Sequence, residues 1–369
     1  MSQFTSDFDI AIIGAGMAGA SLAAECAPHA RVLLVEAEDT PGYHTTGRSA
    51  AFWEKTYGGP GVFPLTMASG RALREGGFLA PRGALHIGQA ADREKVEAFV
   101  EMFGEVGATL KLFDRNDLLA RVPGLRPEWV VGAWEAECAD IDVAGLHQHY
   151  LAASKRTGTV LRVRARVECL EREGNFWRIA WADGEARAPI VANAAGAWAD
   201  TLASLAGGRP LGIQPLRRTI VQLRTKPAPV DNLPLTFGVN GDFYFKPQGG
   251  RLWLSPHDEI PDVAGDAAPE ELDVAIAIDR FEQVVDWKIE ALERRWAGLR
   301  SFAPDRLPVY GYDPTVPGFF WFAGQGGFGI QTAPAAARLG AQLLLGLPHD
   351  GLTAEIDANI YSPSRFWAV

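Results

Sequence analysis

The clearest chemical pattern in the chain is a glycine-rich turn between two apolar segments near its start. A short β-branched run leads into Gly14, Gly16 and Gly19, a helical stretch follows, and a second apolar run ends at Glu36. This order is the fingerprint of a dinucleotide-binding βαβ unit. The glycines allow a tight turn and close approach to a pyrophosphate, and Glu36 can accept a hydrogen bond from a ribose hydroxyl.

A second glycine-rich turn lies near the C-terminus, at residues 324–329, between an aromatic run at 319–323 and a helix expected over 330–345. No strand ending in an acidic residue follows this helix, so we do not expect a second dinucleotide site. Such a turn still presents N–H groups and the positive end of a helix dipole. In a protein that already holds one dinucleotide, the expected target is the electron-rich end of a flavin ring.

The elements that must position these turns alternate between strands and helices. Residues 161–170 alternate apolar and arginine side chains, which predicts one strand with a buried face, and residues 190–193 predict another short strand. Residues 217–300 contain several β-type runs and a helix-like stretch near 274–293. Strands and a helix that interrupt a nucleotide-binding unit indicate a second domain inserted into the first.

We therefore expect an α/β protein with a discontinuous Rossmann-like domain and an interleaved α+β domain built on a mixed or antiparallel sheet. The first domain would comprise residues 1–80, 140–215 and 301–369. The second, which would bind the substrate, would comprise residues 81–139 and 216–300.

Composition excludes several other classes of protein. The 369 residues carry 45 acidic and 35 basic side chains, a net charge of −10 that disfavours a nucleic-acid partner. The three cysteines are far apart and form no CxxC motif, and the pair His147 and His149 has no partner at metal spacing, so we expect neither disulfides nor a metal. Without a leader or an apolar membrane-spanning run, the expected location is cytoplasmic, at most peripheral to the inner membrane.

Several motifs together resemble those of the FAD-dependent D-amino acid oxidase and dehydrogenase family, which includes the glycine and sarcosine oxidases. Within the family, the chain is most similar to bacterial D-arginine dehydrogenases. The motifs are the N-terminal fingerprint, the segments GYHTTGRSA at 42–50, NAAGAW at 193–198 and WAGLRSF at 296–302, and the C-terminal glycine turn.

The resemblance implies non-covalent FAD as the cofactor, although related enzymes attach flavin at a histidine in the neighbourhood of His44. Matched motifs imply that the ADP half is held by Gly14, Gly16, Gly19 and Glu36, and that Val167 and Gly196 meet the cofactor through their backbone. The pyrophosphate and flavin edge would be lined by Thr45, Thr46, Arg48, Ser49 and Ala50. The turn facing the flavin would be formed by Gly326, Gly327, Gly329, Ile330, Gln331 and Thr332.

The same resemblance implies a substrate clamp. Arg217 and Arg300 would bind the substrate carboxylate, because the planar guanidinium makes two parallel hydrogen bonds to it, and Arg218 would be structural. Tyr244 would add a hydroxyl to the carboxylate. Tyr57 matches a tyrosine on a loop over the site, or could be a core aromatic. The carbonyl of Gly327 would accept from the substrate amine.

The expected reaction is oxidative deamination of a D-amino acid: hydride passes from Cα to flavin N5, and the imine is hydrolysed to a 2-oxo acid and ammonia. Reduced flavin would pass its electrons to oxygen or to a quinone. Ala84 stands where D-arginine dehydrogenases carry a glutamate, and Phe52 replaces a histidine, so we expect neutral or apolar D-amino acids to be preferred over D-arginine unless Glu54 compensates. The alternatives are a glycine, sarcosine or other N-methyl amino acid oxidase and a non-catalytic flavin-binding protein.

Overall fold

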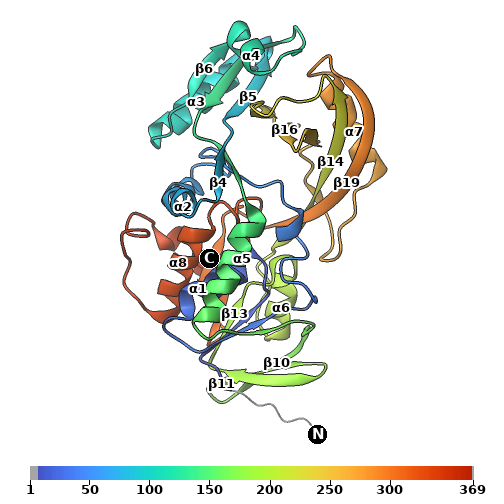
Figure 1. Ribbon diagram of the computed structural model, residues 1–369. Coiled ribbons are helices and arrows are strands. Elements are labelled where there is room, and N and C mark those ends of the chain that lie inside the picture. Colours follow the sequence, from blue (N-terminus) through green and yellow to red (C-terminus); the bar gives the residue numbers. More distant parts are fainter. Residues whose placement is uncertain (1–6, 368–369) are drawn as a thin grey trace.

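The computed structural model describes residues 7–367, which form two large sheets with helices packed around them (Figure 1). A six-stranded sheet has the order β20-β21-β13-β1-β2-β9, and all neighbours except β20 and β21 are parallel. Its strands are β1 (Ile10–Ile13), β2 (Val32–Val35), β9 (Val160–Arg162), β13 (Ile190–Asn193), β20 (Val309–Tyr312) and β21 (Phe319–Ala323).

Both faces of this sheet are covered, as the near-continuous apolar strands require. Buried residues of one face pack with three helices, and those of the other face pack with a small antiparallel sheet and a short helix. The first layer contains α1 (Met17–Cys26), α8 (Ala333–Leu345) and α2 (Phe63–Glu75), with α5 (Val143–Arg156) packed against α1. The second contains β10 (Val167–Glu173), β11 (Phe176–Trp181), β12 (Gly184–Ala188) and α6 (Ala199–Leu205).

A nine-stranded, mostly antiparallel sheet forms the other half of the molecule, at the top of Figure 1. Its order is β18-β14-β17-β16-β15-β5-β7-β6, and β19 also pairs with β14. The strands are β5 (Ala84–Gln89), β6 (Lys111–Asp114), β7 (Trp129–Glu135), β14 (Gln214–Lys226), β15 (Leu235–Gly238), β16 (Tyr244–Gln248), β17 (Arg251–Ser255), β18 (Ile260–Pro261) and β19 (Lys288–Phe302).

Three helices accompany the nine-stranded sheet: α3 (Arg93–Glu105), α4 (Arg115–Arg121) and α7 (Glu271–Glu282). A third small sheet pairs β3 (Phe52–Trp53), β8 (Ala139–Ile141) and β4 (Leu79–Pro81). The nine-stranded sheet takes its strands from residues 84–135 and 214–302, between segments of the six-stranded sheet. The expected α/β class with an interleaved second sheet is therefore confirmed.

Two of the expected elements were wrong. Residues 161–170 do not form one strand, because Arg164 has a φ of 55° and the chain passes there from β9 in one sheet to β10 in another. The helix expected near 274–293 ends at Glu282, and the chain continues as β19 from Lys288. Pairing along the whole of β14 overrides the helical pattern of this segment.

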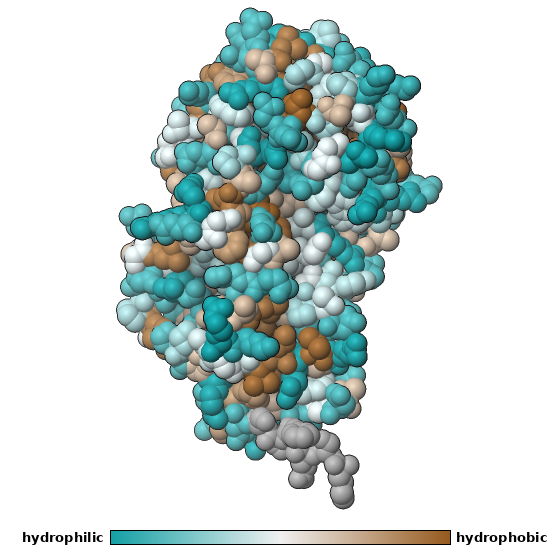
Figure 2. Space-filling view, viewed as in Figure 1, coloured by the Kyte–Doolittle hydropathy of each residue, from teal (hydrophilic) through white to brown (hydrophobic). Residues whose placement is uncertain are grey.

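The surface of the face shown in Figure 2 is largely polar, with apolar residues exposed in separate patches. Across the described part of the chain, none of the helices combines the length and the apolar character that crossing a bilayer requires.

Candidate active site

A long pocket between the two large sheets encloses about 410 Å³, within the range of roughly 300–1,000 Å³ typical of small-molecule and cofactor sites. It extends from the end of β2 to β14, β16 and β19 of the nine-stranded sheet. Most residues predicted from the sequence line it, including segments that are more than 250 positions apart in the chain.

The βαβ turn forms the part of the pocket nearest to β2. Gly14 has a φ of 102°, and a Cβ atom there would lie 2.4 Å from the Ala194 carbonyl oxygen, so the turn requires glycine. Gly16, the N-cap residue of α1, has no side chain to cap the helix and lines the pocket. Glu36 also lines the pocket, and its carboxylate accepts from the N–H groups of Ala15 at 2.8 Å and Glu38 at 2.9 Å.

Gly19 does not line the pocket. A Cβ atom at this position would lie 1.8 Å from the Gly14 carbonyl oxygen, so Gly19 allows α1 to pack closely against the turn. The fingerprint residues therefore divide into Gly14, Gly16 and Glu36, which line the pocket, and Gly19, which permits the packing of the unit.

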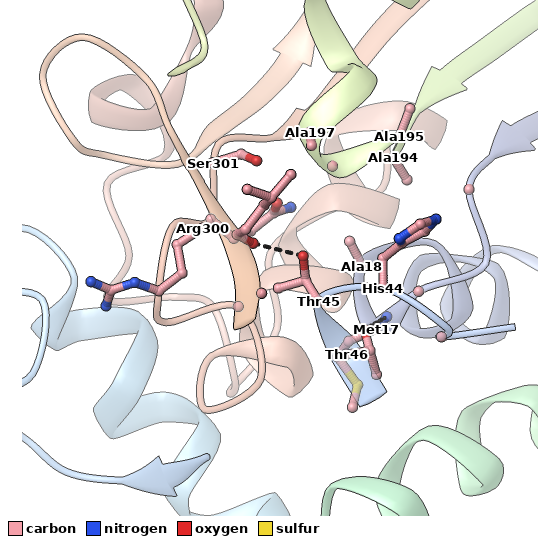
Figure 3. A pocket seen from close by; sticks show the side chains of 18 of the residues that line it. Met17, Ala18, His44, Thr45, Thr46, Ala194, Ala195, Ala197, Arg300 and Ser301 are labelled. Carbon is pink, nitrogen blue, oxygen red and sulfur yellow. Dashed lines mark hydrogen bonds between the residues drawn. The ribbon is translucent and has the colours of Figure 1, made fainter. Parts of the chain in front are cut away.

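The segment 45–50 forms the middle of the pocket, and all of its predicted residues line it: Thr45, Thr46, Arg48, Ser49 and Ala50. Thr45 donates to the Leu299 carbonyl at 2.7 Å (Figure 3), and Thr46 Oγ1 accepts from the N–H of Met17 at 2.9 Å. These bonds join the segment to β19 on one side and to α1 on the other. Val167 and Gly196 also line this part.

Arg48 is occupied by protein groups. It forms an ion pair with Asp266 and donates to the carbonyls of Ala267 at 2.9 Å and Ala297 at 3.2 Å. The loop that carries Asp266 therefore reaches from the nine-stranded sheet across to the segment 45–50.

The C-terminal glycine turn forms the wall near the substrate end. Gly326, Gly327, Gly329, Ile330 and Gln331 line the pocket, whereas Thr332 does not and donates instead to the Phe328 carbonyl at 2.8 Å. The turn leads into α8, which begins at Ala333. Because no strand follows α8 in the described sheets, this turn is not part of a second nucleotide unit.

Arg300, Tyr57 and Tyr244 meet beside this turn and line the pocket. Nη1 of Arg300 donates to the Tyr57 hydroxyl, and Nη2 donates to Glu259 at 2.7 Å. Burial raises the pKa of Tyr57, and it raises that of Tyr244 to about 12. Both phenols are therefore protonated at neutral pH and available as hydrogen-bond donors.

The position of Arg217 corrects the expectation from the sequence. Arg217 does not line the pocket; its guanidinium is bound by Asp262 at 3.2 Å, Glu270 at 2.8 Å and Asp273 at 3.1 Å. Arg218, which we expected to be structural, lines the pocket instead. Successive side chains of a strand leave opposite faces, so only one of the two neighbours can reach the site.

Arg218 is held in place by the backbone. Nε donates to the Asp258 carbonyl at 2.7 Å, Nη2 donates to that of His257 at 3.2 Å, and the guanidinium lies 5.9 Å from the centre of the Tyr244 ring. Its Nη1 is buried without a hydrogen-bond partner among the described residues. A buried donor of this kind is costly unless a ligand satisfies it. Both faces of β14 are buried here, so hydrophobic alternation gives no signal that could have selected Arg218.

Ala84 does not line the pocket; it belongs to a buried apolar cluster of which Phe52, Ile220 and Tyr244 form a wall of the pocket. Ala84 is buried in a cluster with Phe52, Tyr244 and Phe237. Glu54, which could have compensated for the missing glutamate, is fully buried and does not line the pocket. Its Oε1 accepts from Thr56 at 2.7 Å and lies 2.6 Å from His86 Nε2.

His44 lies at the other end of the pocket from Arg218 and Arg300. Its Nε2 is 3.0 Å from Glu38, next to the ribose-binding position expected for Glu36, and its ring packs against Trp198 at 4.8 Å. Figure 3 shows His44 and Arg300 on opposite sides of Thr45. Among the residues described, no group of three or more His, Cys, Asp or Glu side chains could hold a metal ion.

The βαβ turn, the helix start at Gly16 and the carboxylate after β2 define a dinucleotide-binding fold, and the C-terminal glycine turn lines the far end of the same pocket. The chain belongs to the family of FAD-dependent oxidoreductases named DAO, whose model matches residues 9–343. The protein is therefore an FAD-binding flavoprotein and an oxidoreductase of this family. The pocket fits the cofactor, because Gly14 and Gly326 leave no space for side chains and the N-terminus of α1 faces the pocket at Gly16, where backbone N–H groups can bind an anionic group.

Similar proteins cover nearly the whole chain. The hydrogen cyanide synthase subunit HcnC of Pseudomonas aeruginosa is 24% identical over 384 residues, covering 88% of this chain and 89% of that protein. Other curated relatives are longer, and the chain spans 38% of the length of one and 37% of another.

Two solved structures share the fold. The glycine oxidase of Geobacillus kaustophilus has a TM-score of 0.85 at 22% identity, and the superposition covers 98% of this chain and 99% of that chain. The L-proline dehydrogenase of P. horikoshii has a TM-score of 0.85 at 21% identity, with 99% of each chain covered.

Proposed function

We propose that the protein oxidises the carbon–nitrogen bond of a free amino acid, and that its preferred substrates are D-amino acids with a neutral or apolar side chain. One observation carries the proposal. Two guanidinium groups, those of Arg218 and Arg300, meet two protonated phenols, those of Tyr57 and Tyr244, beside the turn at Gly327, and these four side chains form the clamp. A carboxylate is the substrate group that such a donor set binds best.

Arg218 provides the main support, since its buried Nη1 has no partner in the described protein. A substrate carboxylate would satisfy this donor and the hydroxyl of Tyr244. Binding the carboxylate at this point places the adjacent Cα next to the glycine turn, where the carbonyl of Gly327 can accept from the amine. The cofactor-binding residues would be Gly14, Gly16, Glu36, the segment 45–50 and the C-terminal turn.

In the reaction, the substrate ammonium group loses a proton and the Cα–H bond breaks, which leaves an imine. FAD supplies the two-electron acceptor when it is bound, and oxygen or a quinone would then reoxidise it. Water hydrolyses the imine to a 2-oxo acid and ammonia. No side chain of the clamp acts as a base, because both phenols are protonated and both arginines are charged; their contribution is orientation and charge neutralisation.

The preference for neutral side chains rests on the apolar wall. A cationic side chain beside Phe52 and Tyr244, which line the pocket and pack with Ala84, would have no carboxylate partner there. Glu54 is fully buried outside the pocket lining and is already bonded to Thr56 and His86. Burial of an unpaired charge is expensive, so D-arginine and D-lysine should be poor substrates. We therefore propose that the protein shares the reaction of the D-arginine dehydrogenases it resembles, but not their preference for a cationic substrate side chain.

Anaerobic mixing of the FAD-loaded protein with D-amino acids, L-amino acids and sarcosine tests the proposal. We expect neutral D-amino acids to bleach the visible flavin absorbance, and L-forms and D-arginine to do so far more slowly. Bleaching by N-methyl amino acids alone would assign the protein to secondary amines, and fastest bleaching by D-arginine would contradict the meaning given to Ala84. A stable flavin spectrum with every substrate would indicate a non-catalytic flavoprotein.

A further inference from the structure

One acidic residue, Glu259, binds the clamp from outside the pocket. It lies between β17 and β18 and does not line the cavity. Its Oε1 accepts from Arg300 Nη2 at 2.7 Å and from Arg306 Nη2 at 2.9 Å, and it lies 3.5 Å from Arg218 Nη2. Three guanidinium groups therefore surround a single carboxylate of the protein itself.

Two of the three nitrogens of the Arg300 guanidinium are already bonded within the protein. Nη1 donates to Tyr57, Nη2 donates to Glu259, and Nε is buried without a partner among the described residues. A bidentate carboxylate contact needs two parallel N–H groups of the guanidinium. Every such pair includes an Nη atom, and each Nη atom of Arg300 already gives one of its two N–H groups to Tyr57 or Glu259. A substrate carboxylate would therefore have to share the positive charge of Arg300 with Glu259.

We propose that Glu259 is an internal counter-ion that competes with the substrate carboxylate for Arg300, and that Arg306 holds Glu259 when the substrate displaces it. This inference rests on the proposed function, because it assumes that the clamp binds a carboxylate. It makes Glu259 a determinant of substrate affinity, acting through Arg300 rather than through contact with the substrate.

The charges around the clamp agree with such an exchange. Arg218, Arg300 and Arg306 carry three positive charges, and Asp258 and Glu259 carry two negative ones. Asp258 is bound to the backbone N–H of Thr219, at 2.8 and 3.1 Å, and is not available for exchange. The cluster therefore has one uncompensated positive charge, which suits a ligand with one carboxylate.

Exposure explains how Glu259 can move. Its side chain is 33% exposed, whereas that of Arg300 is 10% exposed, so the acid can turn toward water while the arginine stays in place. Arg306 is 51% exposed, and its Nη2 lies 2.9 Å from both carboxylate oxygens of Glu259. Glu259 thus keeps a charged partner on its solvent side after it leaves Arg300.

Two substitutions with opposite expected effects test the proposal. Glu259→Gln removes the competing charge, so a ligand carboxylate should bind about two- to fivefold more tightly, the effect expected from one partly exposed ion pair. Arg306→Gln removes the alternative partner, so Glu259 should stay on Arg300 and the same ligand should bind several-fold more weakly. A merely structural role for Glu259 would weaken binding in both variants.

The probe is isobutyrate, which has the shape of alanine with a methyl group in place of the amine. It is titrated calorimetrically into the FAD-loaded protein, with isobutyramide as the uncharged control ligand. Glu270→Gln is the matched control variant. Glu270 pairs with Arg217, which lies next to Arg218 in β14 but does not line the pocket. We expect this variant to bind isobutyrate as the wild type does, and isobutyramide to bind equally to all variants.

Unchanged or weaker isobutyrate binding in Glu259→Gln would overturn the proposal, as would tighter binding in Arg306→Gln. If Glu259→Gln does not fold, the sign of the Arg306→Gln effect decides. The titration needs no turnover, so it remains informative if no amino acid reduces the flavin and the proposed function fails. With a substrate that does reduce the flavin, Glu259→Gln should lower KM more than it changes kcat.

Discussion

Arg217 and Arg218 are consecutive residues of β14 whose guanidinium groups lie on opposite faces of the nine-stranded sheet. Arg217 is surrounded by three carboxylates, among them the buried Asp273 of α7. Arg218 faces the pocket beside Tyr244. One strand thus supplies a structural arginine and a candidate substrate-binding arginine in adjacent positions.

Substitution of these two neighbours should separate stability from substrate binding. Arg218→Gln removes a charged, two-pronged donor, and we expect kcat/KM to fall about 100-fold, since two charge-assisted hydrogen bonds are lost. Asp258 keeps its bonds to the Thr219 N–H group, so this variant should lose less stability than Arg217→Gln. Arg217→Gln leaves Asp273 buried without its partner, which should cost about 3 kcal/mol of unfolding free energy. Steady-state kinetics and chemical denaturation of both variants measure the two effects. A larger loss of kcat/KM in folded Arg217→Gln than in Arg218→Gln would contradict the assignment.

Gly14→Ala should abolish FAD binding. The new Cβ would lie 2.4 Å from the Ala194 carbonyl oxygen, so the turn that receives the cofactor would have to open. Gly158→Ala is the matched control, because Gly158 has a similar φ of 97° but no atom within 4 Å of the position that a Cβ would take. Both variants bear backbone strain of about 1 kcal/mol, and only Gly14→Ala has the steric clash. The flavin-to-protein absorbance ratio after purification reports the result, and equal ratios in the two variants would refute the explanation.

Stability should decrease between about pH 5 and pH 8 because of Glu135. Burial, together with the charge of Glu54, raises the pKa of this carboxyl from 4.5 to about 8. Glu135 therefore keeps its proton in the folded protein over an interval in which the unfolded chain loses it. Its contribution to stability is fully present below pH 4.5 and is lost as the pH rises toward 8.

Glu135→Gln removes this dependence. The Tm of the variant minus the Tm of the wild type should therefore increase as the pH rises from about 5 to about 8. Thermal unfolding of the two FAD-loaded proteins at about pH 5 and about pH 8 measures this difference in Tm. Glu128→Gln, at an exposed position close by, should follow the wild type. If the Tm of the variant minus that of the wild type decreased toward about pH 8, Glu135 would be ionised in the folded state.

Acid precipitation should release the flavin into the supernatant. His44 packs against Trp198 and Glu38 at the nucleotide end of the pocket, so it is not positioned to bond to a flavin ring beside the clamp. Accordingly, His44→Ala should retain a flavin absorbance spectrum, with at most weaker binding. Yellow colour that stays with the wild-type precipitate and is lost in His44→Ala would instead show a covalent bond at this residue.

The parts of the fold that were predictable from sequence are those determined by local chemistry. The turn at Gly14 and the acid at Glu36 depend on a short stretch of chain with a fixed spacing, and so does the turn at Gly326. Their positions in the pocket follow from the βαβ unit and from the helix start, without knowledge of the rest of the molecule.

The parts that were not predictable depend on contacts between distant segments. Arg217 and Arg218 have the same type and nearly the same position, and the buried residues around them give no alternation from which the inner face could be identified. Glu259 meets Arg300 only because β17, β18 and β19 come together in space. The break at Arg164 likewise reflects the passage between two sheets, which the alternating pattern of 161–170 concealed.

The pairing of β14 with β19 also fixes the spacing of the two arginines of the clamp. Leu216 lies opposite Arg300 and Arg218 lies opposite Gly298, so the two arginines are diagonal neighbours on one face of a continuous hydrogen-bonded ribbon. Their separation is set by the ladder, whereas Tyr57 and Gly327 belong to segments outside the sheet. A tilt of one sheet against the other would change the height of the ribbon above the glycine turn and leave the spacing of the two guanidinium groups unaltered. The two arginines would therefore hold the carboxylate of any substrate at the same position. Substitutions elsewhere in the pocket could then change which substrate side chain is preferred without moving the carboxylate.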